Sequence, residues 1–286
     1  MKTVQQVITG RAIKVGTIQV QELLPHQGSF FNPFLVFHHG IAIANKNIPL
    51  NEQGVGPHPH RGFSPISFIY KGGIHHQDSR GNNHKVYAGG TQWTSAGMGI
   101  IHSERIPEDI FDYGGIQEIL QVWVNTPAAN KMEQPAYYPA TKEDTPTIIT
   151  PDGLTIVRIP AGAINGIKGI IPTYTDVTTV MIEMKQGGSF NFNFKKNHAT
   201  LIYVLNGAIT INQQQNLFSK EMALMNNDGE DFTITATENS YLFVGSGAPI
   251  NEPITSHGPF VMNTQSEILE AFRDYQQGKM GVLIES

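Results

Sequence analysis

Two short histidine motifs carry the residue types that bind transition metals. His58 and His60 lie two positions apart, and so do His102 and Glu104. In an extended chain, residues i and i+2 point to the same face, so each pair can present two ligands together. Three imidazole nitrogens and one carboxylate oxygen form a sufficient ligand set for Fe, Ni, Cu, Mn or Zn. The sequence therefore predicts that these four residues form one metal site.

The chain between the two pairs is long enough to place them on facing strands. A strand is expected over residues 64–70, a turn at Lys71-Gly72-Gly73, and a glycine-rich return before His102. A lone His-x-His pair is often only two solvated or hydrogen-bonded histidines, and the second pair favours the metal interpretation. This spacing is typical of a small β-barrel.

The composition limits both the fold and the chemistry. The 286 residues include 29 glycines, 17 prolines and no cysteine, and the formal net charge is −5. Scattered glycine and proline fit many short strands joined by tight turns, so an all-β fold is expected. Without cysteine there are no disulfides or thiolate sites, and any redox chemistry must belong to a metal. The charge gives no basic stripe, which argues against direct nucleic-acid binding.

Other common functional signatures are absent from the sequence. There is no HExxH motif, no nucleophile elbow and no P-loop. No apolar run is long enough to span a bilayer, and the first residues lack a continuous apolar core. The chain is therefore expected to be soluble and cytoplasmic, without a membrane partner.

Two β-domains of the same architecture are expected. Residues 1–130 would form the first domain with the metal site, residues 131–150 a linker rich in proline, and residues 151–286 the second domain. In the second domain His198 stands alone, and a lone histidine is usually structural or on the surface. The chemistry is therefore expected in the first domain only.

Two local signals stand out in the second domain. Asn206-Gly207 lies between two short apolar stretches and predicts a hairpin. Near the end of the chain, Thr264 and Glu267 form a capping box for the only clear helix, which ends before Gly278. The apolar stripe of this helix is expected to pack on the core and consists of Ile268, Leu269, Phe272 and Tyr275.

Three polar residues near the metal motifs have open roles. Gln121 alternates with apolar residues in a strand over 117–125, and it meets a ligand or substrate only if its face points inward. His38 and His39 are adjacent, so at most one of them can face inward. A surface pair at the end of a strand is the simpler interpretation of these two histidines.

Longer motifs throughout the chain resemble the pirin family, which is a family of bicupins. The matching segments cover residues 57–63, 76–82, 92–104, 120–125, 251–254, 258–264 and 275–278. The resemblance implies two tandem cupin barrels of the jelly-roll type, with a short C-terminal helix. It also implies Fe(II) in the N-terminal barrel, held by the positions equivalent to His58, His60, His102 and Glu104. Mn, Ni, Cu or Zn would fit the same ligands.

The resemblance implies a function as well. Some pirins are similar to dioxygenases that open a flavonol such as quercetin with O₂ and release carbon monoxide. In that case Glu104 is a catalytic residue that takes the hydroxyl proton of the substrate, a flavonol or another aromatic enediol. The alternatives are a non-enzymatic iron-binding regulator of a transcription factor or enzyme, and a zinc- or manganese-dependent isomerase of the wider cupin group. A monomer is expected.

This chain departs from the family pattern at two places. His38-His39 and Ser64 stand where the family usually has acidic residues. Ser64 cannot act as a carboxylate ligand, so Glu104 is the only nearby carboxylate with suitable spacing.

Overall fold

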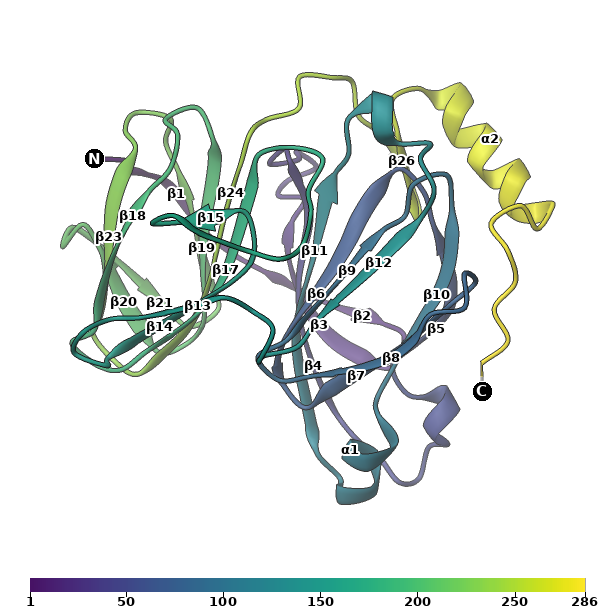
Figure 1. The fold of residues 1–286 in the computed structure, drawn as a ribbon, viewed down its shortest axis with the longest axis horizontal. Helices are drawn as coiled ribbons and strands as arrows, with labels where there is room; N and C mark the ends of the chain where they lie inside the picture. Colours follow the sequence, from purple (N-terminus) through teal and green to yellow (C-terminus); the bar gives the residue numbers. More distant parts are fainter. Residues whose placement is uncertain (286) are drawn as a thin grey trace. The chain divides into compact units, whose positions relative to one another are not determined.

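The structure is a computed structural model that describes residues 1–285, and it consists mostly of antiparallel strands (Figure 1). Its contacts divide the chain into two compact units. Unit 1 comprises Met1–Arg11, His26–Pro33 and Glu143–Pro249. Unit 2 comprises Ala12–Pro25, Phe34–Lys142 and the segment from Ile250 onward. The prediction of an all-β fold is confirmed.

Unit 2 holds the predicted metal motifs between two sheets. The larger sheet has the order β12 (Ala136–Ala140), β9 (Thr91–Ser95), β6 (Phe63–Lys71), β11 (Ile116–Asn125), β4 (Phe34–Ile43), β3 (Ile18–Leu24) and β2 (Arg11–Val15). The smaller sheet has the order β5 (Val55–His60), β10 (Ile100–Arg105), β7 (Gly73–Asp78) and β8 (Asn83–Tyr87). Short helical segments lie in the loops at η1 (Leu50–Glu52), α1 (Glu108–Tyr113) and η2 (Ala128–Asn130).

Unit 1 repeats this arrangement of strands. Its larger sheet has the order β1 (Val4–Thr9), β22 (Glu221–Met225), β19 (Ala199–Asn206), β24 (Ser240–Gly247), β17 (Val177–Met184), β14 (Thr155–Ala161) and β13 (Thr147–Ile149). Its smaller sheet has the order β18 (Ser189–Asn193), β23 (Asp231–Ala236), β20 (Ala208–Ile211) and β21 (Gln215–Phe218). A separate short pair is formed by β15 (Ala163–Ile164) and β16 (Ile167–Lys168). By sheet order, β18 and β23 correspond to β5 and β10 of unit 2.

Apolar side chains fill the space in unit 1 where unit 2 carries its histidines. On β18, Phe190 and Phe192 are buried and alternate with exposed asparagines. On β23, Phe232 and Ile234 point into the same core. This alternation is the period-two pattern of a half-buried strand. Unit 1 therefore has a packed apolar core at the positions that would hold a metal.

The two units do not follow the predicted domain boundaries. Strand β1 pairs with β22, so the N-terminus completes unit 1. The predicted linker over residues 131–150 contains β12, which pairs with β9, and β13, which pairs with β14. After Ile250 the chain returns to unit 2 with β25 (Thr255–His257), β26 (Phe260–Met262) and α2 (Gln265–Gln276). Pairing between distant strands depends on register, which a local composition pattern does not reveal.

Helix α2 confirms the predicted cap and packs against β26 (Figure 1). Thr264 Oγ1 accepts a hydrogen bond from the Glu267 backbone N–H, and the Glu267 carboxylate accepts one from the Thr264 N–H. Ile268 and Ala271 are buried on β26, whereas Leu269 is 57% exposed. The predicted apolar stripe is therefore wrong at Leu269 and at Tyr275, which is 39% exposed, because the buried face of the helix is centred on Ile268 and Ala271.

The predicted hairpin at Asn206-Gly207 is also wrong. Strands β19 and β20 belong to different sheets, so this turn carries the chain from one sheet to the other. Gly207 has φ +88°, and Gly72 has φ +70° at the equivalent corner between β6 and β7. Glycine adopts this left-handed conformation without steric cost. The Asn206-Gly207 motif therefore correctly predicted a tight turn, but it did not reveal that β19 and β20 pair with other strands.

The buried Lys131 fastens β26 to unit 2. Its side chain is 1% exposed, and its Nζ donates to Gly62 O at 2.6 Å, Asn125 Oδ1 at 2.9 Å and Val261 O at 3.1 Å. Burial lowers the pKa of Lys131 to about 8. The Lys131 ammonium group is therefore held by three neutral oxygens.

Replacing Lys131 with methionine is expected to lower the free energy of unfolding by about 2–4 kcal/mol, because the oxygens of Gly62, Asn125 and Val261 each lose one buried hydrogen bond. Chemical denaturation measures this change. Lys14→Met, at an exposed position of the same unit, is the control and should change stability by less than about 0.5 kcal/mol. Equal denaturation midpoints for the two variants would contradict the fastening role.

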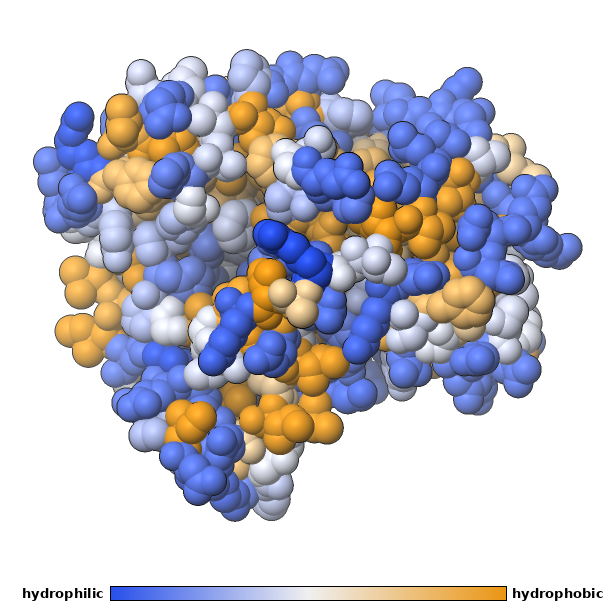
Figure 2. All heavy atoms as spheres, turned by 180° about the vertical axis from the view of Figure 1, so that it is seen from behind, coloured by the Kyte–Doolittle hydropathy of each residue, from blue (hydrophilic) through white to orange (hydrophobic). Residues whose placement is uncertain are grey.

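The surface and the helices add two observations. Figure 2 shows exposed apolar side chains on one face as separate groups among hydrophilic ones. Within residues 1–285, the helices fall short of the length and apolar character that crossing a membrane requires.

Candidate metal centre

The structure brings the three predicted histidines together. His58 and His60 lie on β5, and His102 lies opposite His58 on the adjacent β10. One ligand atom from each ring lies within 4.8 Å of the other two, the one such cluster found among the described residues. His60 is 2% exposed, His102 is 1% exposed, and His58 is half-buried. A single ion can therefore be reached by all three imidazoles.

The hydrogen bonds of these rings fit a divalent metal. His58 Nδ1 lies 2.8 Å from Gly56 O, and His60 Nδ1 lies 3.3 Å from Pro259 O. A ring nitrogen that faces a carbonyl oxygen must donate, so Nε2 of each ring keeps its lone pair. Nε2 of His60 and of His102 are buried without a hydrogen-bond partner. Buried unpaired acceptors are costly, and coordination to a metal would satisfy them.

Burial also keeps these histidines in the form that binds metals. It lowers the pKa of His58, and it lowers the pKa values of His60 and His102 well below 6.5. The charges of neighbouring histidines lower the pKa values of His60 and His102 further, whereas the Gly56 carbonyl and Glu104 oppose the shift at His58. The rings are therefore neutral at pH 7, as metal coordination requires.

The lowered pKa values predict that the metal-free protein loses stability as the pH falls below 6.5. In that range the unfolded chain binds protons that the buried imidazoles do not, so protonation favours the unfolded state. Urea denaturation between about pH 7.5 and 5.5 measures the effect. The double variant His60→Ala/His102→Ala should show a weaker dependence. A free energy of unfolding that stays constant across this range would contradict the prediction.

Glu104 lies beside the triad, but its carboxylate is held by amide and hydroxyl donors. Its Oε1 accepts hydrogen bonds from Ser67 Oγ at 2.7 Å and from Gln92 Nε2, and its Oε2 accepts one from Gln121 Nε2 at 2.7 Å. The three donors come from β6, β9 and β11 of the larger sheet. The cluster of ligand atoms does not include Glu104, so its role as the fourth ligand stays a prediction.

A row of polar side chains crosses the larger sheet at the level of Glu104. Paired positions on successive strands are Glu22, His38, Gln121, Ser67 and Gln92. The inward alternative for Gln121 is therefore confirmed. Sequence reasoning missed Ser67 and Gln92, because only the strand register brings them opposite a residue of β10.

The prediction of a surface pair at His38-His39 is wrong. The two side chains face opposite ways, but both lie within β4 rather than at its end. His39 is 2% exposed and its Nε2 lies 3.1 Å from Glu118 Oε1. His38 faces the interior, with its Nε2 3.4 Å from Glu22 Oε1. Ser64 is buried beside Ser95 and supplies no charge.

A pocket with mostly apolar walls opens next to Glu104. Its enclosed volume is about 30 Å³, and it opens to the solvent. The polar lining residues are Glu104, Gln121, Gln117 and His38. The apolar lining residues are Val15, Ile18, Val20, Val55, Ile74 and Ile119. Apolar walls with a few converging polar groups are typical of a small-molecule site.

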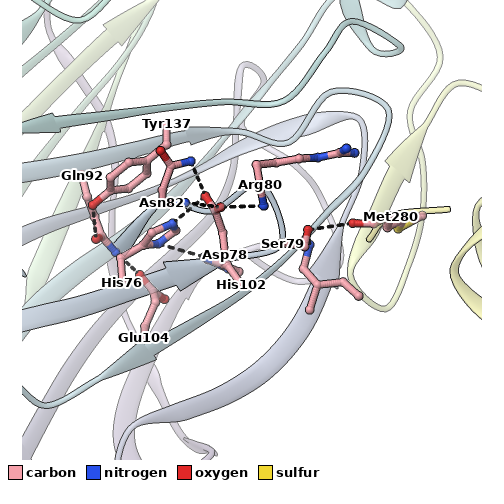
Figure 3. Close-up of polar contacts among 11 residues, drawn as sticks. His76, Asp78, Ser79, Arg80, Asn82, Gln92, His102, Glu104, Tyr137 and Met280 are labelled. Carbon is pink, nitrogen blue, oxygen red and sulfur yellow. Dashed lines mark hydrogen bonds and ion pairs between the residues drawn. The ribbon is translucent and has the colours of Figure 1, made fainter. Parts of the chain in front are cut away.

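Two side chains next to the triad were not predicted. His76 on β7 is fully buried, and its Nδ1 lies 3.5 Å from Nδ1 of His102 (Figure 3). The ring of Tyr137, from the predicted linker, stacks on His76 with centroids 4.0 Å apart and an angle of 8°. Tyr137 donates to Gln92 Oε1 at 3.2 Å. The available signal was the His-x-Asp pattern of His76 and Asp78, which resembles the spacing of His102 and Glu104.

Comparison with known proteins agrees with this fold. Residues 17–124 match the family described as Pirin, and residues 179–281 match the Pirin C-terminal cupin domain. A Pseudomonas aeruginosa protein provisionally named quercetin 2,3-dioxygenase is 32% identical over 254 residues, which cover 88% of this chain and 87% of that protein. Pirin-1 of Arabidopsis thaliana is 33% identical over 236 residues, covering 80% and 78%.

Solved structures show the same architecture. A crystal structure of quercetin 2,3-dioxygenase from Acinetobacter baumannii has a TM-score of 0.92 and 32% identity, and it covers 99% of this chain and 100% of its own. A bacterial pirin of Escherichia coli in complex with nickel(II) has a TM-score of 0.66 at 19% identity, covering 85% and 99%. At that identity the second likeness shows the fold alone. The prediction of two cupin domains is confirmed, and the chain belongs to the pirin family.

Proposed function

We propose that this protein is an Fe(II)-dependent dioxygenase that opens a flavonol such as quercetin and releases carbon monoxide. The observation that carries the proposal is the convergence of one ring nitrogen from each of three histidines, beside a carboxylate and an apolar pocket. The names of the relatives from P. aeruginosa and A. baumannii support the same reaction class. A buried site of this kind suits a planar aromatic molecule with adjacent oxygen atoms.

The overall reaction fixes which bonds change. The bonds from C3 of the flavonol to C2 and C4 break, and C3 leaves with its own oxygen as carbon monoxide. Both atoms of O₂ enter the ring-opened ester. A bound divalent metal would supply a Lewis acid for the adjacent substrate oxygens and a partner for O₂. His58, His60 and His102 would hold that metal, with Fe(II) proposed and Mn, Ni, Cu or Zn compatible with the same ligands.

The chain's own side chains would then manage the proton and the rings of the substrate. Glu104 would take the proton of the 3-hydroxyl group, while Ser67, Gln92 and Gln121 keep its carboxylate oriented toward the pocket. Ile18, Val20 and Ile119 would pack against the aromatic rings and exclude water. His38 places an imidazole on the same wall, where a second polar substituent of the substrate could bind.

The non-enzymatic alternative, an iron-binding regulator of another protein, requires no pocket. A shallow charged surface above the histidines would favour it, whereas the walls next to Glu104 are mostly apolar. The isomerase alternative has no observation in its favour. The apolar walls next to Glu104 therefore favour catalysis on a small molecule over docking of a charged protein surface.

The test is anaerobic loading with Fe(II), followed by quercetin in air. We expect loss of the visible absorption of quercetin together with one carbon monoxide for each quercetin consumed. His58→Ala should abolish both signals, and His198→Ala, a histidine of unit 1 outside the site, should retain them. Stoichiometric Fe(II) binding without turnover would refute the dioxygenase and favour the regulator.

A further inference from the structure

A carboxylate and a second imidazole lie behind His102, on the side away from the proposed metal. His76 Nε2 lies 3.0 Å from Asp78 Oδ2, and His76 Nδ1 lies 3.5 Å from His102 Nδ1 (Figure 3). The side chains of His76 and Asp78 are both 0% exposed. In the pairing of β7 with β10, Asp78 stands opposite His102 and His76 stands opposite Glu104. Asp78, His76 and His102 thus form a hydrogen-bonded series that ends at one proposed ligand of the metal.

The contacts of this hydrogen-bonded series favour one arrangement of the protons on the rings of His76 and His102. Asp78 accepts, so His76 donates from Nε2 and keeps a lone pair on Nδ1. His102 then donates from Nδ1 to His76, which leaves the lone pair of His102 on its unpartnered Nε2. The reverse arrangement would point the His76 Nε2 lone pair at a carboxylate and bury an unpaired N–H on His102. Asp78 and His76 therefore select the tautomer of His102 that can bind a metal.

The two residues behind His102 are themselves fixed in place. Asp78 Oδ1 accepts from the backbone N–H groups of Arg80 at 2.8 Å and Asn82 at 3.1 Å, and Oδ2 accepts from Asn82 Nδ2 at 2.8 Å (Figure 3). Burial raises the pKa of Asp78, but hydrogen bonds from His76, Asn82 and Arg80 outweigh it and lower the pKa. The stacked ring of Tyr137 holds the plane of His76. Neither His76 nor Asp78 is exposed to solvent.

We propose that His76 and Asp78 are positioning residues that fix the metal-binding tautomer of His102 and increase electron donation from its Nε2. The inference rests on the metal centre of the proposed function, and it assigns a task to two residues outside the ligand set. Carboxylate–histidine pairs behind metal ligands orient the ring and raise its basicity. Here a second imidazole is interposed between the carboxylate and the ligand.

Three variants test the contacts of Asp78 and His76 separately. Asp78→Asn removes the charge and offers an N–H₂ group in place of an acceptor, which would favour the opposite tautomers of His76 and His102. His76→Asn keeps an oxygen near the Nδ1 position that can accept from His102, but it loses the contact to Asp78. His76→Leu loses both. The control is His75→Asn on the same strand, because His75 faces away and contacts Asn83.

Two measurements on folded protein report on the metal itself. Competition titration with Co(II) should show that Asp78→Asn and His76→Leu weaken binding by roughly 10–100-fold. His76→Asn should recover part of that loss, and His75→Asn should match the wild type. Redox titration after loading with iron should show a more positive Fe(III)/Fe(II) potential in Asp78→Asn, because reduced electron donation stabilises Fe(III) less. A purely structural role would alter thermal stability without moving this potential.

The outcomes distinguish this inference from the proposed function. Wild-type Co(II) affinity together with an unchanged potential in Asp78→Asn and His76→Leu would overturn the inference, whatever the activity of the protein. The predicted losses in a protein that does not turn over quercetin would support the inference and refute the dioxygenase. A wild-type protein that binds neither Co(II) nor Fe(II) would overturn both.

Discussion

Replacing His102 with alanine is expected to weaken the binding of Fe(II) or Co(II) by at least about 100-fold, since loss of a direct ligand should exceed the loss of a supporting residue. His102 is the candidate metal ligand whose ring is held most firmly by its surroundings. It is 1% exposed, its Nε2 is buried without a partner, and its other nitrogen is directed at His76. The remaining two imidazoles would leave the ion with solvent in place of a nitrogen ligand.

Equilibrium dialysis followed by elemental analysis measures this loss. His198→Ala is the matched control, because His198 is also buried but lies in unit 1 near Asp176. We expect the control to keep the metal content of the wild type. Equal metal content in His102→Ala and wild type would show that the three-histidine cluster does not hold the metal.

Glu104→Gln is expected to lower kcat for quercetin by about 10²–10⁴-fold, the usual contribution of a positioned general base. The glutamine has nearly the same shape but cannot take the proton. The amide N–H₂ group of the glutamine would also face another hydrogen-bond donor, because Ser67, Gln92 and Gln121 all donate to the native carboxylate. The metal affinity should fall less than in His102→Ala, because three histidines remain.

The matched control for this prediction is Glu118→Gln. Glu118 is buried too, and hydrogen bonding to His39 and Lys71 lowers its pKa to about 2 against the effect of burial. It faces away from the pocket, so its replacement should reduce stability and leave kcat close to that of the wild type. Steady-state rates with Fe(II)-loaded protein decide the point. An unchanged kcat in Glu104→Gln would exclude Glu104 as the base.

The convergence of the three histidines was predictable because its geometry is local. Two residues on one strand share a face whenever they are two positions apart, so His58 and His60 had to point the same way. The second pair, His102 and Glu104, lies on a strand that proved to be the direct neighbour. The capping box of α2 was predictable for the same reason, since Thr264 and Glu267 lie within one turn.

The surroundings of the site were not predictable, because they depend on strand register. Ser67, Gln92 and Gln121 are separated along the chain, and only the pairing of β9, β6 and β11 aligns them opposite Glu104. The carbonyl of Pro259 that fixes the ring of His60 lies 199 residues away. Composition also suggested a linker where β12 brings Tyr137 onto His76. A sequence pattern contains none of these pairings.

The most direct test of a dioxygenase is the fate of ¹⁸O₂. Fe(II)-loaded protein would be given quercetin under ¹⁸O₂, with mass spectrometry of the ring-opened product and of the carbon monoxide. We expect two ¹⁸O atoms in each molecule of product and unlabelled carbon monoxide, because C3 leaves with its own oxygen. Product oxygen derived from water, or consumption of quercetin without carbon monoxide, would contradict this expectation.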